Sequence, residues 1–478
     1  MPILRPSGAA MVFYRPPRLL ASITIALFAA TLPSISLSAE GSETANNQPA
    51  RPSSLNSQLS TQRPNIILIM ADDLGAECLS CYGSLDDETP RLDALAKGGA
   101  RFTHAHSQPL CTPSRVQIMT GKYNFRNYDD FGYLDPEETT FADMFRESGY
   151  RTAIAGKWQL SGQTRQHPRY TDPADWGFDE HCLWQLNNRA PYGDRGPRYW
   201  NPYLEKNGEV IRPGENAYGP DVCAEFLIDF MTRHQDEPFL VYYPMILTHS
   251  PFLPTPDSNR SLPRDKKNVR NFRDMVAYMD AIVGRIVDHV ASLGLTKDTV
   301  IIFAGDNGTS GKVTTRTTDG KIRGDKGSTT TAGTHVPLIV RWPGRVPAGA
   351  TDDRLIDFTD VLPSLLAAAG IEPPKEASLD GVPFLDAAGL SEPGRSAIYC
   401  WYEPRHSQRM AHRNAIFARN HDYKLYADGR FFHVAKTPRQ RESDLLKPPL
   451  SAEETNARGK LQAVLDHYAG EIAHSLVD

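Results

Sequence analysis

The sequence predicts an α/β fold with a large, mostly parallel central sheet flanked by helices, followed by a small C-terminal antiparallel β subdomain plus one helix. Two patterns indicate the central sheet. Nearly continuous apolar runs, typical of buried parallel strands, occur at residues 65–70, 239–243, 299–303 and 337–340. Stretches with helical periodicity lie between them, and this alternation is typical of a parallel sheet.

The helices are placed by the spacing of their apolar residues. In residues 269–293, Val276, Met279, Val283 and Ile286 recur at helical intervals. Residues 357–369 form a second amphipathic stretch, and Gly370 directly after it is typical of a helix end. These stretches predict the helices that cover the sheet.

After about residue 390 the pattern changes to short strands with tight turns, predicted at residues 396–401, 414–419, 423–426 and 430–434. A last helix is predicted at residues 452–476. We therefore divide the ordered part of this 478-residue chain into a main domain at 63–390 and a small α+β subdomain at 391–478. The net charge of −5 argues against a nucleic-acid-binding protein with a dominant basic surface.

The first residues are typical of a secretory signal peptide. Arg5, Arg15 and Arg18 precede a short apolar stretch at 19–30, and small residues follow up to Ala39. The stretch is short for a membrane-spanning helix, so cleavage near Ala39 is favoured over a membrane anchor. We expect a signal peptide at 1–39, a disordered linker at 40–62, and export to the periplasm or the cell exterior without stable membrane insertion.

Export makes disulfides possible, but the pairing of the cysteines cannot be deduced from sequence. Cys78 and Cys81 have the spacing of a CxxC motif, which we interpret as structural thiols or a local bridge rather than a redox centre. The cysteines are Cys78, Cys81, Cys111, Cys182, Cys223 and Cys400.

Acidic side chains follow two predicted strands directly. Asp72 and Asp73 come after the first strand, and Asp306 and Asn307 come after the strand at 299–303. Ligands of open α/β sheets bind beyond the carboxyl ends of strands, and these oxygen atoms suit a hard cation such as Ca²⁺. Both aspartates can reach one ion only if the chain bends, which Leu74-Gly75 would permit. Either cluster alone fits a simple turn, but together they predict a divalent-metal site.

The segment Cys111-Thr112-Pro113-Ser114-Arg115 is the most informative part of the sequence. Thr112 suits the N-cap of a helix, and Pro113 suits its first turn. Cys111 would then lie at a helix N-terminus, where free N–H groups favour anions, and Arg115 would rise near the same end. An isolated cysteine is more often a small buried hydrophobic residue, so its neighbours carry this interpretation.

This segment, with Met119-Thr120-Gly121 after it, resembles the C-x-P-S-R…T-G signature of the type I sulfatases of the alkaline phosphatase superfamily. Residues 149–158, Gly-Tyr-Arg-Thr-Ala-Ile-Ala-Gly-Lys-Trp, resemble their second signature. The resemblance extends from about Pro64 into the C-terminal subdomain. It implies that residues 63–390 are the N-terminal sulfatase catalytic domain and that the protein is a sulfuric ester hydrolase.

In this family a maturation enzyme oxidises the signature cysteine to formylglycine before folding is complete. One hydroxyl of the hydrated aldehyde attacks the sulfur of a sulfate ester, and the other drives the return to the aldehyde and expels sulfate. The resemblance implies one Ca²⁺ ion held by Asp72, Asp73, Asp306, Asn307 and the modified Cys111. The ion would polarise the sulfate and lower the pKa of the attacking hydroxyl.

The remaining site residues also follow from matching positions. Arg115 would hold the formylglycine hydrate, and Lys157 and Lys326 would bind sulfate oxygens in the transition state. His249 would contact the sulfate and help to protonate the leaving oxygen. Without the resemblance, both lysines and His249 would be ordinary packing or surface residues.

Gln159 departs from the family pattern, which usually has histidine after Lys-Trp. Glutamine can form hydrogen bonds but cannot act as a base near neutral pH, so turnover could be slowed or the site altered. Residues 331–337 also differ from many family members, which we interpret as subfamily variation.

Other residues could contact a glycan. The aromatic side chains at 199–203 precede Asn207-Gly208, which favours a hairpin with packed aromatics over a sugar-stacking surface. Two basic groups fit either further sulfates of a polyanionic glycan or a solvated surface. These are the stretch 316–326 and the set Arg405, Arg409, Arg413 and Arg419.

We therefore expect hydrolysis of a sulfate ester, with a sulfated carbohydrate favoured over a small aryl sulfate. Two alternatives remain open at this point. One is a phosphodiester or phosphonate monoester hydrolase of the same superfamily, using the same groups. The other is a protein that binds sulfated glycans without turnover, which Gln159 could indicate.

Overall fold

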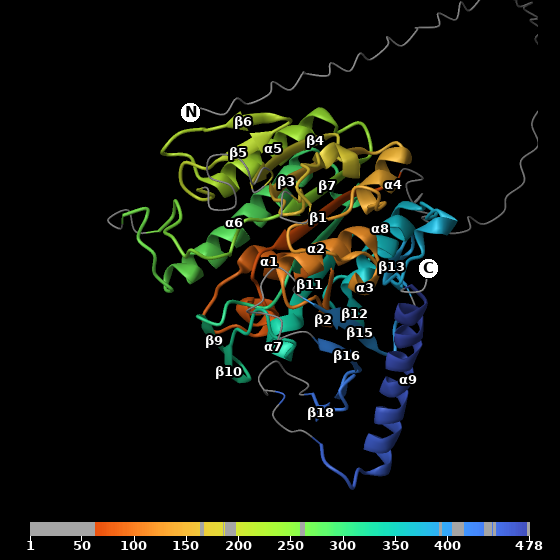
Figure 1. The fold of residues 1–478 in the computed structure, drawn as a ribbon. Coiled ribbons are helices and arrows are strands. Elements are labelled where there is room, and N and C mark those ends of the chain that lie inside the picture. Colours follow the sequence, from red (N-terminus) through yellow and green to blue (C-terminus); the bar gives the residue numbers. More distant parts are fainter. Residues whose placement is uncertain are drawn as a thin grey trace, which may run out of the picture. The chain divides into compact units, whose positions relative to one another are not determined.

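The computed structural model describes residues 63–162, 167–184, 186, 197–258, 263–391, 394–403, 415–434, 442 and 446–475. Within these residues one central sheet has ten strands in the order β12-β2-β11-β8-β1-β7-β3-β4-β5-β6 (Figure 1). They are β1 (Asn65–Ala71), β2 (Ala100–His106), β3 (Arg151–Lys157), β4 (Glu180–Trp184), β5 (Leu204–Lys206), β6 (Glu209–Ile211), β7 (Phe239–Pro244), β8 (Thr299–Gly305), β11 (His335–Arg341) and β12 (Ala350–Asp357).

The centre of the sheet is parallel, as predicted. The adjacent strands β8, β1, β7, β3 and β4 all run the same way, and β12 is parallel to β2. The strand predicted at 337–340 exists as β11, but it is antiparallel to both β2 and β8, so its expected direction was wrong. A strand that is buried on both faces shows the same apolar run whichever way it points.

Helices cover both faces of the sheet (Figure 1). On one face, α1 (Pro90–Lys97), α5 (Gly219–Arg233) and α6 (Asn271–Ser292) share a core with one side of β1. On the other face, α2 (Cys111–Thr120), α4 (Phe141–Glu147) and α8 (Val361–Ala369) share a second core with its opposite side. The predicted helices at 269–293 and 357–369 are therefore confirmed as α6 and α8, and Gly370 caps α8 with a φ of 65°.

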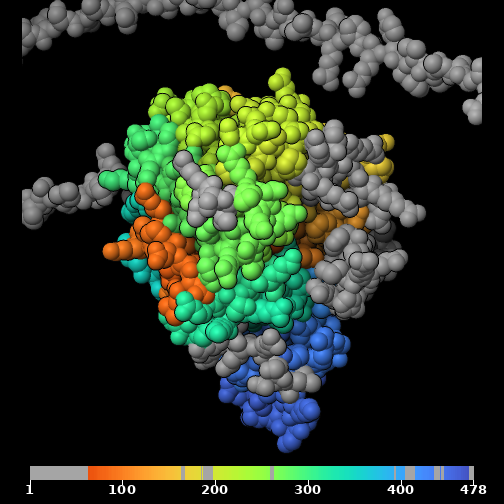
Figure 2. Space-filling model, turned by 90° about the vertical axis from the view of Figure 1, so that its left-hand side faces the viewer, coloured from red at the N-terminus to blue at the C-terminus, as the bar shows by residue number. Residues whose placement is uncertain are grey.

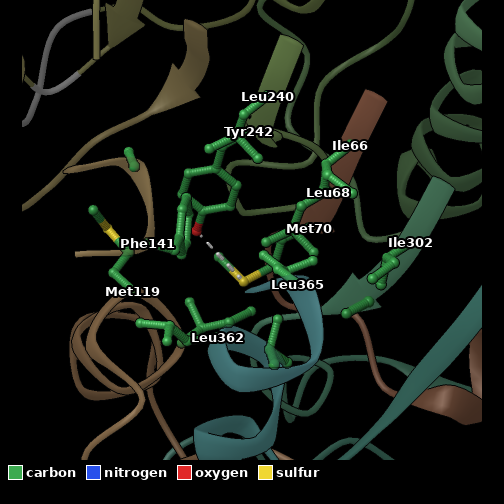
Figure 3. Close-up of a cluster of buried hydrophobic side chains, with 14 of the residues drawn as sticks. Ile66, Leu68, Met70, Met119, Phe141, Leu240, Tyr242, Ile302, Leu362 and Leu365 are labelled. Carbon is green, nitrogen blue, oxygen red and sulfur yellow. Dashed lines mark hydrogen bonds between the residues drawn. The ribbon is translucent and has the colours of Figure 1, made fainter. Parts of the chain in front are cut away.

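Strand β1 shows why its sequence is apolar throughout. Ile66, Leu68 and Met70 face the core formed with α2, α4 and α8, whereas Ile67 and Ile69 face the other core. Figure 3 shows the first group packed around Phe141, Tyr242 and Leu365. Because successive side chains of a strand point to opposite faces, a strand between two helix layers needs apolar residues at every position.

The hairpin predicted at Asn207-Gly208 is confirmed. These residues have φ values of 49° and 84° and connect β5 to β6, a backbone conformation that the Asn-Gly pair adopts readily. Tyr199 is buried, and the guanidinium of Arg264 covers the ring of Trp200 at 4.2 Å. The nearby aromatics therefore pack within the protein, as the hairpin interpretation expected.

The C-terminal part contains a four-stranded antiparallel sheet of β15 (Ile398–Tyr402), β16 (Ala415–Arg419), β17 (Tyr423–Tyr426) and β18 (Phe431–His433). Helix α9 (Ala452–Ser475) packs on it through Ala457, Leu461 and Leu465. The predicted small β sheet with a helix is confirmed, while the boundary at residue 390 stays a prediction. The short elements are α3 (Asn124–Asn127), α7 (Thr331–Thr334), β9 (Thr314–Thr317), β10 (Gly320–Arg323), β13 (Leu385–Asp386) and β14 (Gly389–Leu390).

The predicted signal peptide (1–39) and linker (40–62) lie outside the described residues. Among the helices that are described, none combines the length and apolar character needed to span a bilayer. The cysteines, all within the described part of the chain, are free thiols here. Cys78 is buried against the hydroxyl groups of Thr309 and Thr315, which agrees with a structural role rather than a redox one.

Candidate active site

Polar side chains gather at the carboxyl ends of four neighbouring parallel strands, β8, β1, β7 and β3. Asp306 follows β8, Asp72 follows β1, His249 lies in the loop after β7, and Lys157 is the last residue of β3. Carboxyl ends of parallel strands meet at one edge of a sheet. Side chains far apart in the sequence are therefore brought to one place.

Asp72 and Asp73 both reach this place because the chain bends at Asp73 itself, not at Leu74-Gly75 as predicted. Asp73 has a φ of 61°, in the left-handed region that aspartate tolerates better than most residues. Its backbone N–H donates to Asp306 Oδ1 at 2.9 Å, which holds the bend. Gly75 has an ordinary φ of −77°.

Lys157 is paired with Asp72. Its Nζ donates to the two carboxylate oxygens at 3.0 and 2.9 Å, and both side chains are buried. Gly156 is required for this placement because a Cβ there would lie 2.0 Å from the carbonyl oxygen of Pro244. The glycine of the second signature thus lets the end of β3 approach the end of β7.

Cys111 is the first residue of α2 and is buried, so its predicted position at a helix N-terminus is confirmed. The prediction of Thr112 as the N-cap was wrong, because Leu110 takes that position with extended backbone. The Leu110 carbonyl accepts hydrogen bonds from the backbone and hydroxyl of Ser114. Thr112 instead accepts from the backbone N–H of Gly132 at 3.3 Å.

Arg115 extends from α2 into the cluster and is buried. It donates to Asp306 Oδ2 at 3.1 Å and to the carbonyl oxygen of Lys157 at 3.0 Å. Burial opposes its charge, but Asp306, with Asp72 and Cys111 adding to it, raises the pKa of Arg115 above its ordinary value. Arg115 is thus a fixed cation that ties α2 to the ends of β3 and β8.

Asn307 offers an oxygen with no partner. Its side-chain N–H₂ donates to Asp73 Oδ1 at 3.0 Å and to the carbonyl of Gly308 at 2.9 Å. Its Oδ1 is buried and accepts no hydrogen bond from any described residue. Because an unpaired buried acceptor costs about 1–3 kcal/mol, a ligand on this oxygen would stabilise the site.

Two more side chains approach Asp73. Lys326, in the loop after β10, places Nζ 2.5 Å from Asp73 Oδ1. Burial opposes the charge of Lys326, but Asp73 and Cys111 raise its pKa above the ordinary value. His249 Nε2 lies 3.8 Å from Asp73 Oδ2. Burial lowers the pKa of His249 to about 4, although Asp73 and Asp72 oppose this effect, so the imidazole is neutral near pH 7.

The carboxylates differ in charge state. Burial favours the neutral form of each, but Lys157 holds the pKa of Asp72, and Lys326 that of Asp73, below the ordinary value. Burial and the nearby charge of Asp72 raise the pKa of Asp306 to about 7. The site thus combines three carboxyl groups with three cations, and of these side chains only Lys326 is partly exposed, at 19%.

These residues fit a hard divalent cation. Asp72, Asp73 and His249 have ligand atoms within 4.8 Å of one another. Ca²⁺ prefers oxygen to imidazole nitrogen, so the third aspartate and the open Oδ1 of Asn307 suit it better than His249 does. The geometry therefore supports the oxygen set predicted from the sequence.

Comparison with known proteins gives the family. The family model described as Sulfatase matches residues 64–371, well over half of the chain, and the model described as N-sulphoglucosamine sulphohydrolase, C-terminal, matches residues 325–447. The chain belongs to the sulfatase family. The predicted resemblance to type I sulfatases is thereby confirmed.

Curated relatives of this sulfatase-family protein include human arylsulfatase A (Homo sapiens), which is 32% identical over 356 residues, covering 66% of each chain. N-acetylgalactosamine-6-sulfatase of the dog (Canis lupus familiaris) is 30% identical over 356 residues, covering 68% of this chain and 66% of the relative. The chain thus aligns with slightly less than two thirds of each relative's length.

Solved structures share the fold. A structure solved in complex with its substrate, D-glucosamine-2-N,6-O-disulfate, has a TM-score of 0.67 at 20% identity, covering 86% of this chain and 99% of that one. The phosphonate monoester hydrolase of Agrobacterium radiobacter has a TM-score of 0.61 at 20% identity, covering 85% and 96%. At these identities the likeness shows the sulfatase-family fold alone.

Sequence reasoning missed Arg198. Its Nη1 lies 3.0 Å from His249 Nδ1, and its guanidinium lies over the ring of Trp184 at 4.1 Å. The carbonyl of Ser250 lies 2.5 Å from the same Nδ1, so the ring is held on this side while Nε2 faces Asp73. No motif surrounds Arg198 in the sequence, so only the fold reveals this contact.

The basic residues predicted as possible glycan contacts are mostly engaged elsewhere. Arg316 pairs with Asp86 at 2.6 Å, and Arg323 donates to a backbone carbonyl. Arg419 is buried, so it neither contacts a glycan at the surface nor forms part of a solvated surface. The other members of its group, Arg405, Arg409 and Arg413, lie outside the described residues.

Proposed function

We propose that this protein is a calcium-dependent sulfatase that hydrolyses a sulfate ester of a carbohydrate, with Cys111 as the precursor of its formylglycine nucleophile. One observation carries the proposal. Asp72, Asp73, Asp306 and the open oxygen of Asn307 lie together at the sheet edge. Arg115 joins this group to the helix that begins at Cys111.

The two absent groups each supply one kind of chemistry. Bound Ca²⁺ would polarise the sulfate and favour the ionised form of a nearby hydroxyl, and formylglycine would supply a hydrated aldehyde whose second hydroxyl allows sulfate to leave. Asp72, Asp73, Asp306, Asn307 and the modified Cys111 would hold the ion. The remaining steps belong to side chains of the chain itself.

Lys157 and Lys326 are placed to bind the sulfate oxygens. Each now contacts a carboxylate that would ligate the ion, Asp72 for Lys157 and Asp73 for Lys326. Once a cation occupies those oxygens, charge repulsion favours turning the ammonium groups toward an anionic ligand. They would then stabilise the negative charge of the transition state in a largely buried site, where such contacts are stronger than in water.

His249 would act on the leaving oxygen. In the tautomer that carries its proton on Nε2, that N–H faces the site, since Nε2 lies 3.8 Å from Asp73 Oδ2. That N–H can donate to the oxygen of the ester as the bond to sulfur breaks. Arg115 would hold the hydrate of the nucleophile.

A carbohydrate substrate is favoured by the relatives, whose names include a sulfatase of N-acetylgalactosamine 6-sulfate, and by a structural neighbour solved with a disulfated glucosamine. The proposed modification of Cys111 requires a formylglycine-generating maturation enzyme as a partner. The predicted export after cleavage near Ala39 remains part of the proposal.

The proposal is tested on protein from its native host, loaded with calcium. Mass spectrometry of the peptide containing Cys111 should show loss of the sulfur and gain of an aldehyde or its hydrate. The same protein should release sulfate from 4-nitrophenyl sulfate faster than it hydrolyses bis-4-nitrophenyl phosphate or a phenylphosphonate monoester. Faster hydrolysis of the phosphate diester or of the phosphonate monoester would instead identify a phosphodiester or phosphonate hydrolase. An unmodified Cys111 would show that the proposed nucleophile does not exist.

One observation favours a second candidate, a sulfated-glycan-binding protein without turnover. Gln159 has a φ of 62° and is 8% exposed, and its Oε1 has no hydrogen-bond partner in the described part of the chain. Because glutamine cannot carry a proton as histidine does, chemistry at this position is restricted. Glycan affinity without sulfate release, in fully modified and calcium-loaded protein, would favour this candidate.

A further inference from the structure

A pocket adjoins the proposed active site. It has a volume of about 710 Å³ and is lined by Arg198, His249, Ser250, Pro251, Phe252, Lys267, Asn268, Val269 and Lys312. His249 belongs to both places, because its Nε2 lies 3.8 Å from Asp73 Oδ2 while its ring lines the pocket. A molecule whose ester oxygen met His249 would therefore extend into this pocket.

The pocket is strongly basic. Arg198, Lys267 and Lys312 come from three separate segments, and the pocket lining contains no carboxylate. In the described residues no acidic group pairs with Lys267 or Lys312. Figure 2 shows green surface, from the chain between about residues 265 and 290, beside teal surface, from the chain around residue 320, so these distant stretches meet on one face.

This excess of charge is local. Arginines that follow the pocket residues in the sequence are neutralised, since Arg273 pairs with Asp86 and Asp87 and Arg316 pairs with Asp86. No carboxylate of the pocket lining neutralises Arg198, Lys267 or Lys312, so these cations can pair with an anionic ligand. Arg198 is also fixed in place by the Trp184 ring and by His249, so little side-chain entropy would be lost when it binds an anion.

The rest of the lining suits a sugar. Pro251 and the edge of Phe252 line the pocket, and Phe252, which is 5% exposed, anchors this part of the wall in the apolar core. Ser250 and Asn268 add hydrogen-bonding groups beside them. An apolar surface with a few polar groups is typical of a small-molecule site.

We propose that this pocket binds a second anionic group, a sulfate or a carboxylate, on the carbohydrate whose sulfate ester is hydrolysed. The inference rests on the proposed function, and it narrows the substrate to a polyanionic glycan. The ester sulfate would lie against Lys157 and Lys326, while the second anion meets Lys267, Lys312 and Arg198. A neutral sugar monosulfate would leave these cations without a partner.

The test measures binding, so it does not depend on turnover. Isothermal titration gives the dissociation constants of tetrasaccharides from dextran sulfate, polygalacturonate and neutral dextran, in calcium buffer at low salt. The variants are Lys267→Gln/Lys312→Gln and, as matched control, Lys266→Gln, whose exposed neighbouring side chain does not line the pocket. The double variant should bind at least one acidic tetrasaccharide about tenfold or more weakly, which corresponds to roughly 1.4 kcal/mol.

Whether dextran sulfate, polygalacturonate or both show this loss distinguishes a sulfate from a carboxylate as the second group. Wild-type affinity for both acidic sugars in the double variant would overturn the inference. An equal loss in Lys266→Gln would also overturn it, because the effect would then be one of general surface charge. Failure of the proposed function is separate, since it shows as absent sulfate release from 4-nitrophenyl sulfate whatever the binding result.

Discussion

The Nζ of Lys157 donates to both carboxylate oxygens of Asp72, at 3.0 and 2.9 Å, and neither side chain reaches solvent. The pair joins the ends of β3 and β1, which are separated by β7 in the sheet. It therefore couples the stability of the fold to the geometry of the proposed active site.

Replacing Lys157 with methionine should destabilise the protein by about 3 kcal/mol, because the buried Asp72 carboxylate loses its nearest cation and keeps only Arg115, at 4.0 Å. Urea unfolding in the presence of a chelator measures the loss without interference from bound metal. Lys97→Met, at an exposed position, is the control and should unfold like the wild type. A Lys157→Met protein as stable as the wild type would show that the pair contributes nothing to the fold.

Calcium should stabilise the protein through Asn307. Saturation at one hundred times the dissociation constant corresponds to about 2.7 kcal/mol, so the thermal midpoint should rise with added Ca²⁺ and fall with chelator. Asn307→Ala should lose most of this calcium-dependent rise. Asn65→Ala is the matched control, because this buried asparagine lies at the opposite end of β1, where its side chain bonds to Thr299 and to the backbone of Phe239. An equal rise in both variants would exclude Asn307 as a ligand.

Acidification should destabilise the protein through His335. Burial lowers the pKa of His335 from its ordinary 6.5 to about 4, and His104 and Arg419 act in the same direction. The folded state holds a neutral imidazole while the unfolded chain gains a proton below pH 6.5. Stability is therefore unaffected by this group above pH 6.5, and falls by roughly 3 kcal/mol as the pH drops to about 4.

Denaturant unfolding at pH 7.5 and pH 4.5 measures this effect. His335→Gln, which keeps a donor for the Thr103 carbonyl but cannot titrate, should show a smaller difference between the two pH values than the wild type. His467→Gln, at an exposed position of α9, should behave as the wild type. An unchanged difference in His335→Gln would assign the acid sensitivity to other groups.

Gln159 should show a conflict between stability and activity. Its φ of 62° is unfavourable for a side-chain-bearing residue, so Gln159→Gly should stabilise the protein by about 1 kcal/mol. If the amide contributes to the reaction, the same variant should lower kcat for 4-nitrophenyl sulfate. Gln159→His should raise kcat if the missing base limits turnover.

Ser378→Gly is the control for strain alone. Ser378 has a φ of 45° and lies in an exposed turn outside the proposed active site, so its replacement should stabilise the protein without changing kcat. Equal kcat values for the wild type, Gln159→Gly and Gln159→His would show that this position takes no part in the reaction.

The predicted elements agree well with the fold because most of their signals are local. The apolar run of β1 indicates burial on both faces of the strand, and the helical spacing of α6 indicates burial on one face of the helix. The direction of β11 was missed since burial carries no information about strand polarity. The N-cap of α2 was misplaced because Thr112 is a residue type that suits a helix start, but its hydroxyl accepts from Gly132 and Leu110 takes the N-cap position.

The sequence by itself determined the fold class and, through the signature around Cys111, the family. It also supplied the candidate residues, whose types suit calcium and sulfate. Only the tertiary structure decided how they meet: the left-handed bend at Asp73, the pairing of Lys157 with Asp72, and the contact of Arg198 with His249. The physical reason is that burial and periodicity are read along the chain, whereas a site is formed by strand order and loop conformation, which bring distant residues within a few ångströms.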